Sequence, residues 1–170
     1  MQPCAGCDSA EQARPIRLAG TQLDDQGELR LYFGDTCSEV DTVEVELSRD
    51  RPDAADTVLD TWAVTSEGGA SLSELTLGVV PDDFRQTDAL RADWTDADFA
   101  RLQIALPDDD RGLVLDVPEL TAQAPDHPGE WYVNNLREVS GGEASSGWYT
   151  EDGYHGLLDP DTGITPICAP

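Results

Sequence analysis

The chain contains no lysine, and its ten basic residues are all arginine, against 35 aspartates and glutamates. The formal net charge of −25 at pH 7 repels the phosphates of nucleic acids and the headgroups of anionic lipids, so we discount both as partners. The same charge favours solubility, divalent cations and basic partners. A GC-rich genome and adaptation to salt would each produce this composition.

Long apolar runs are also absent. No stretch approaches the roughly 20 residues of a membrane-spanning helix, so no transmembrane segment is predicted. No apolar leader follows Met1, although residues 5–7 (Ala-Gly-Cys) match the last three positions of a lipoprotein-processing site. Together with the disulfides that the four cysteines favour, which persist in oxidising compartments, this match leads us to expect an extracellular or cell-surface protein, either secreted or lipid-anchored.

Signatures of catalysis and nucleotide binding are missing as well. No glycine-rich phosphate loop follows a strand, and no Gly-x-Ser-x-Gly elbow is present. The sequence therefore gives no catalytic residue and predicts no cofactor.

What the chain does contain is apolar and polar residues in alternation. This period is typical of strands with one buried face. The predicted strands cover residues 29–33, 43–47, 58–64, 72–79, 100–106, 113–117 and 131–133. Clusters of Gly, Pro and Asp separate them, which favours an all-β, immunoglobulin-like antiparallel β-sandwich. A single helical turn is expected at residues 95–98.

The chain length predicts one domain. Residues 1–15 form an N-terminal tether with a CxxC motif, and residues 16–170 form the sandwich. Within it, residues 135–170 are expected to be a loop-rich segment packed on the strands.

Four cysteines stand at Cys4, Cys7, Cys37 and Cys168. The even count and their placement near both ends favour two disulfides, each joining one N-terminal cysteine to Cys37 or Cys168. A structural zinc held by all four thiols is an alternative, but a second CxxC half-site is absent. A redox-active CxxC is a further alternative.

One stretch resembles a known group of proteins. Residues 75–84 (LTLGVVPDDF) place Gly-x-x-Pro at the end of a strand, followed by a phenylalanine that returns to the core. Together with the strand around Trp62 and the position of Cys37, this resembles small secreted or lipid-anchored proteins of actinobacteria. The resemblance covers about residues 16–135. It implies an immunoglobulin-like envelope domain and no catalytic residue.

Aromatic residues give the candidate binding surface. Trp62 and Trp131 fall in predicted strands and are assigned to the core. Trp94 and Trp148 lie outside the strands and are predicted to be exposed anchors. We expect a ligand to meet the surface formed by Trp94, Trp148, Tyr149, Tyr154 and His155, because loops on a rigid scaffold are the usual place of recognition. Burial of these rings under the C-terminal segment is the competing interpretation.

A candidate metal site lies at Asp159 and Asp161, which have the D-x-D-x-G spacing of a calcium-binding turn. Gly163 stands where a third ligand is usual, so a plain turn is the alternative. We hypothesise a non-catalytic binding module of the bacterial cell envelope, with a protein or a glycan as partner. The alternative is a secreted, glycan-directed hydrolase that uses paired carboxylates.

Overall fold

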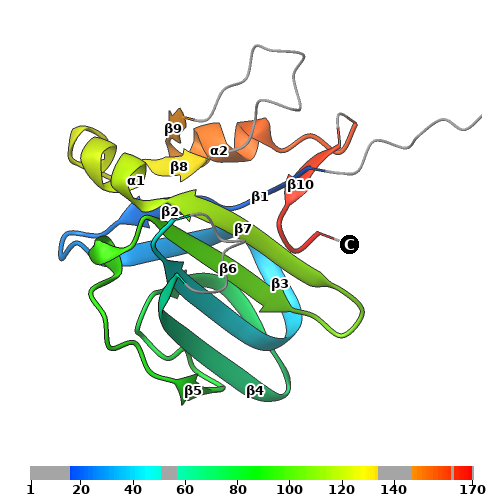
Figure 1. Cartoon of the computed structure of the whole chain (residues 1–170). Helices are drawn as coiled ribbons and strands as arrows, with labels where there is room; N and C mark the ends of the chain where they lie inside the picture. Colours follow the sequence, from blue (N-terminus) through cyan, green and yellow to red (C-terminus); the bar gives the residue numbers. More distant parts are fainter. Residues whose placement is uncertain (1–15, 51–56, 134–146, 162, 170) are drawn as a thin grey trace, which may run out of the picture.

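The computed structural model describes residues 16–50, 57–133, 147–161 and 163–169. These residues form a mainly β fold with one large antiparallel sheet, shown in Figure 1. Cys4 and Cys7 lie outside the described residues. Within the described ranges, no helix is long and apolar enough to cross a membrane.

Two long strands organise the sheet. They are β3 (Leu29–Ser48) and β4 (Val58–Thr76), which pair with each other along most of their length. On the other edge of β3, its first part pairs with β2 (Gly20–Leu23) and its last part with β6 (Phe99–Ala105). The sheet therefore has two limbs that share β3 and β4.

The first limb continues from β2 to β8 (Trp131–Val133) and β9 (Gly147–Tyr149). The second limb has β7 (Asp110–Asp116) next to β6, and β5 (Phe84–Asp88) on the far side of β4. The alternation predicted from the sequence is confirmed along β3, where Leu29, Leu31 and Phe33 of the first limb are buried.

Irregular pairing between β3 and β4 allows β3 to be part of both limbs. The β3–β4 register shifts between Tyr32 and Cys37, between Cys37 and Val40, and again before Thr42. Such bulges bend a strand and increase its local twist. As a result, the apolar faces of both limbs meet in one core that contains Phe33 of the first limb and Trp62 of the second.

The helical elements are short. The expected turn is present as a 3-10 turn, η1 (Trp94–Asp96), which Asp93 caps. The sequence interpretation missed two α-helices, α1 (Val117–Gln123) and α2 (Glu151–Leu157), and a second 3-10 turn, η2 (Ala124–Asp126). It also extended one strand too far: residues 72–79 were predicted, whereas β4 ends at Thr76 and Val79 is 57% exposed.

The two ends of the described chain meet. Strand β1 (Ile16–Leu18) pairs in parallel with β10 (Ile164–Pro166), apart from the large sheet. The C-terminal segment is more regular than the predicted loop, because its described part contains β9, α2 and β10.

A disulfide joins Cys37 of β3 to Cys168, which follows β10. It confirms that Cys168 tethers the C-terminal segment. The predicted pairing of Cys37 and Cys168 with the N-terminal cysteines is wrong, because the two bond to each other. A four-thiol zinc site is incompatible with this bond.

Candidate functional site

The residues predicted to form a binding surface divide into buried and accessible ones. Trp94 is 5% exposed and packs in the core, so its assignment as an exposed anchor is wrong. Trp148 belongs to strand β9 instead of a loop and is half-buried. Tyr149 is also half-buried, whereas His155 is exposed.

Tyr154 is fully buried and serves as an anchor of α2. Its hydroxyl donates a hydrogen bond to the carbonyl of Leu18 at 3.0 Å. Burial, followed by the nearby Tyr32, raises the pKa of the Tyr154 hydroxyl far above its usual value. Gly34 makes room for the ring, since a Cβ there would lie 2.8 Å from the Tyr154 oxygen. Tyr154 therefore positions its neighbour His155 and offers no contact to a ligand.

An aromatic cluster forms on the outer face of the first limb, and Tyr32 stands at its centre. We define the aromatic cluster as Tyr32, Trp131, Tyr154 and His155. The Tyr32 ring lies 5.1 Å from that of Trp131, 5.5 Å from Tyr154 and 5.9 Å from His155. Its hydroxyl is 2.9 Å from Nε2 of His155, which connects β3 with α2. Burial, and then the charge of Glu151, raises the pKa of Tyr32.

Gly20 of strand β2 leaves room for the side chain of Trp131. A Cβ at Gly20 would lie 3.1 Å from the Cβ of Trp131, so a side chain at this position would crowd the tryptophan. Because Gly20 has none, the Trp131 ring lies close to β2 and reaches Tyr32. The Arg30 guanidinium lies over the same ring, 5.5 Å from its centre and within cation–π range.

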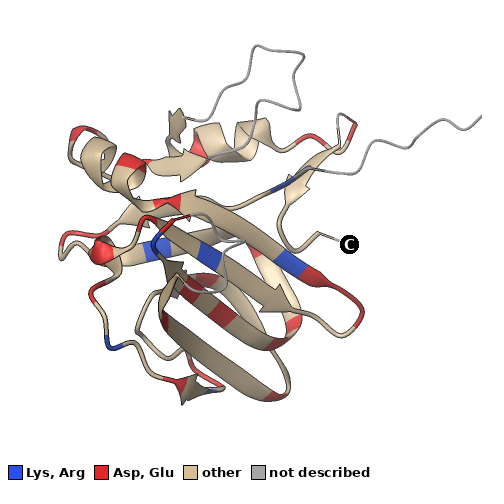
Figure 2. Ribbon diagram, viewed as in Figure 1, with Lys and Arg blue, Asp and Glu red and all other residues tan. Residues whose placement is uncertain are grey.

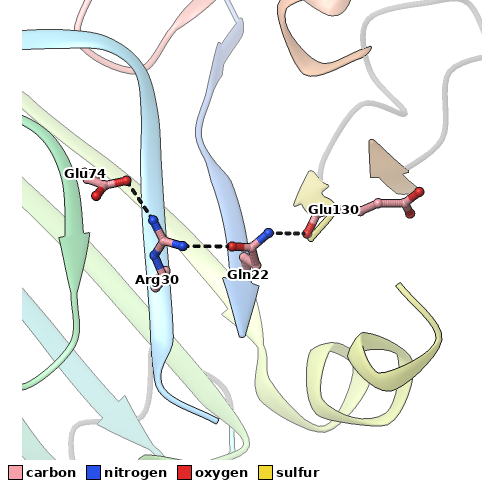
Figure 3. Close-up of polar contacts among 4 residues, drawn as sticks. All are labelled: Gln22, Arg30, Glu74 and Glu130. Carbon is pink, nitrogen blue, oxygen red and sulfur yellow. Dashed lines mark hydrogen bonds and ion pairs between the residues drawn. The ribbon is translucent and has the colours of Figure 1, made fainter. Parts of the chain in front are cut away.

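A polar ladder crosses four consecutive segments of the same face, as Figure 3 shows. We define the polar ladder as Glu74, Arg30, Gln22 and the carbonyl of Glu130. Arg30 donates to Glu74 at 2.9 Å and to the side-chain oxygen of Gln22 at 3.2 Å. The Gln22 amide in turn donates to the Glu130 carbonyl at 3.2 Å. The ladder orients each side chain by hydrogen bonds to its neighbours.

Beyond the ladder, the side chain of Glu130 makes a further contact. Its carboxylate lies 2.8 Å from Nδ1 of His127, whose ring stacks on Trp148 at 4.8 Å between centres. The indole N–H of Trp148 donates to Gln123 of α1 at 2.9 Å. Trp148 is thus committed to fixing α1 and β9 on the sheet.

Asp159 and Asp161, the predicted calcium ligands, lie in a turn that is closed by a β-bridge. Asp159 and Ile164 form an antiparallel bridge, and the Asp159 carboxylate accepts the backbone N–H of Asp161 at 2.9 Å. This is the local geometry of a plain turn. Among the described residues, no group of three or more His, Cys, Asp or Glu is placed to hold a metal ion.

Acidic residues are spread over turns, strands and helices in Figure 2. One open hollow of about 400 Å³ is lined by Asp50, Asp98 and Asp116 together with Phe99. Two of these carboxylates accept backbone hydrogen bonds: Asp98 from the N–H of Asp50 and Asp116 from that of Glu119.

The acids whose pKa values are displaced do not resemble a general acid, which needs a raised value. Hydrogen bonds from the backbone of Ala92 and Arg91 lower the pKa of Asp60, and those from Thr95 lower the pKa of Asp93.

Sequence reasoning missed Arg30, Tyr32, Gln22 and Glu74. A signal for two of them was present, since Arg30 and Tyr32 are the outward positions of an alternating strand. Their partners come from strands whose register the sequence does not show.

Comparisons with known proteins add no identity. No protein-family model, no curated protein and no solved structure matches this chain.

Proposed function

We propose that the chain is a non-catalytic binding module of the bacterial cell envelope, with an immunoglobulin-like sandwich as its scaffold. The observation that carries this proposal is the face formed by the aromatic cluster and the polar ladder. Its buried members, Trp131 and Tyr154, are fixed by packing, and its accessible members, Tyr32 and His155, are hydrogen-bonded to each other. A face ordered in advance loses little conformational entropy when it binds.

Two further observations support the proposal. The Cys37–Cys168 disulfide fits an oxidising compartment outside the cytoplasm, where such bonds persist. The two limbs face one core, as the layers of a sandwich do. The resemblance to actinobacterial envelope proteins stays part of this proposal.

The test measures binding of the purified protein to isolated bacterial cell-wall material and to a panel of envelope glycans. His155→Ala should weaken binding about tenfold, because it removes an exposed ring and the partner of the Tyr32 hydroxyl. Val58→Ala is the control, since Val58 is exposed at the start of β4 in the second limb, and it should change binding less than about twofold. Equal binding by the wild type and His155→Ala would refute the assignment of this face.

The hydrolase alternative is favoured by one observation, the three aspartates around the hollow at Phe99. Its readout is the release of reducing ends from the same glycans. Release that Asp98→Asn and Asp116→Asn abolish would establish the alternative, and we expect no release.

A further inference from the structure

Strand β4 has a free edge in the first limb. Its neighbour β5 pairs with it only from Ala63 to Ser66. Beyond that point, from Ala70 to Thr76, β4 pairs with β3 alone among the described residues. A free edge presents backbone N–H and C=O groups that can pair with another chain.

The backbone groups at this edge can be assigned from the strand geometry. The N–H of Leu77 donates to the carbonyl of Leu29, next to β3. Because alternate residues of an antiparallel strand face the same neighbour, Leu75 also faces β3. Glu74 therefore directs its backbone N–H and C=O away from β3, toward the free edge.

A hollow of about 680 Å³ marks the place where β5 leaves β4. A widened bulge of β4 with Gly69 at φ +81° lines one side, and the start of β5 with the half-buried Phe84 lines the other. Glu67 and Asp83 contribute carboxylates to the lining, with Arg85 as the basic residue. An added strand along residues 70–76 would end in this hollow.

The polar ladder ends at the same edge. Glu74 is its last member, and its side chain is 56% exposed. Oε2 accepts from Arg30, while Oε1 has no partner among the described residues. In Figure 3 each member contacts a residue of the neighbouring segment, so a cation on a strand added beside β4 would continue the ladder.

We propose that an extended basic segment of a partner protein adds to β4 as a strand along residues 70–76, with a lysine or arginine opposite Glu74. This rests on the proposed binding function and names its partner class. Main-chain hydrogen bonds supply affinity in such complexes, and side-chain contacts supply the register. The net charge of −25 favours a basic segment over a second copy of the chain, which it repels.

The probe is a labelled eight-residue peptide of alternating lysine and valine, with binding followed by fluorescence anisotropy at two salt concentrations. Glu74→Gln should weaken binding about tenfold, because it removes a charge-assisted hydrogen bond. Glu28→Gln is the matched control, since Glu28 is an exposed turn residue, and it should have less than about a twofold effect. N-methylation of alternate peptide nitrogens should abolish binding, because it removes the donors of the added strand.

The variant Arg30→Gln distinguishes a direct contact of Glu74 with the peptide from a structural role of Glu74 in the polar ladder. If Glu74 matters only through the ladder, Arg30→Gln weakens peptide binding as much as Glu74→Gln does. The proposal expects Arg30→Gln to bind at least as tightly as the wild type, because it frees the Glu74 carboxylate. Thermal unfolding of each variant confirms that it is folded.

The proposal would be overturned by equal losses for Glu74→Gln and Glu28→Gln, by unchanged binding of the N-methylated peptide, or by self-association of the free protein that Glu74→Gln removes. The last would identify a second copy as the occupant. If the peptide fails while cell-wall or glycan binding still depends on His155, only the strand addition is refuted. If both fail, the proposed function is refuted too.

Discussion

Replacing both bonded cysteines, Cys37→Ala with Cys168→Ala, tests the pairing on which the C-terminal half depends. The bond joins residues 131 positions apart. Loop-closure entropy for a loop of this size stabilises the folded state by about 5 kcal/mol. Since a domain is typically stable by about 5–15 kcal/mol, the double variant should lose a large share of its stability.

The structure also predicts where the loss begins. Cys37 is fully buried, and Ile167, next to Cys168, is 1% exposed and donates its N–H to the Leu18 carbonyl at 2.8 Å. Without the bond, β10 is retained by non-covalent contacts, namely its pairing with β1, the Asp159–Ile164 bridge and the packing of Ile167. Hydrogen exchange should therefore accelerate first in β10 and then in α2.

The assay is urea unfolding of oxidised protein, with Cys4→Ser/Cys7→Ser as the matched control. Because the structure pairs Cys37 with Cys168, the control should unfold within about 0.5 kcal/mol of the wild type. A loss of less than about 1 kcal/mol for the Cys37/Cys168 variant, or an equal loss for the control, would refute the reasoning.

Three further predictions concern stability. Tyr154→Phe removes the buried hydrogen bond to Leu18 and should cost about 1–2 kcal/mol in urea unfolding; a neutral effect would contradict the anchoring role. Asp60→Asn should destabilise the protein at pH 7. The Asp60 pKa is lower in the folded state than its ordinary value of 3.8, so its stabilisation is present above that value and is lost as the pH falls through the folded pKa. The gap between wild type and variant should therefore close below about pH 3 in unfolding curves, and a gap independent of pH would count against it. Finally, the melting temperature should rise from low to moderate sodium chloride, because salt screens the repulsion within a chain of net charge −25, and a flat or falling curve would argue against this.

Parts of β3, β4, β6, β7 and β8 could be predicted from the sequence, because alternation records which side of a strand is buried. The prediction divided β3 and β4 into two strands each and missed the other strands. Val43, Val45 and Leu47 are buried as the pattern indicates. Alternation does not record the partner of a strand, so the ladder from Glu74 to Gln22 depends on registers that only the structure shows. The cysteine pairing was wrong for a related reason, since four cysteines permit three connectivities and spacing does not choose among them.

The missed helices had local signals. Asp116 precedes α1 as its cap, Pro118 stands in the first turn, and Thr150 caps α2. Each helix has only seven residues, too few to display a helical period, and Gly153 and Gly156 weaken the signal of α2 further. The burial of Trp94 could not be predicted locally, because it results from tertiary packing of the η1 turn against the core.

The parallel pairing of β1 with β10 determines how the domain would carry a mechanical load. A pull on the segment before Ile16 and an opposing pull beyond Cys168 draw the two parallel strands past each other lengthwise, so their hydrogen bonds share the load and must break together. Tension entering at the C-terminal side divides between β10 and the Cys37–Cys168 bond, which transmits its share directly to β3. Under such a pull, the two strands and the covalent bond together act as a clamp that keeps the sheet closed.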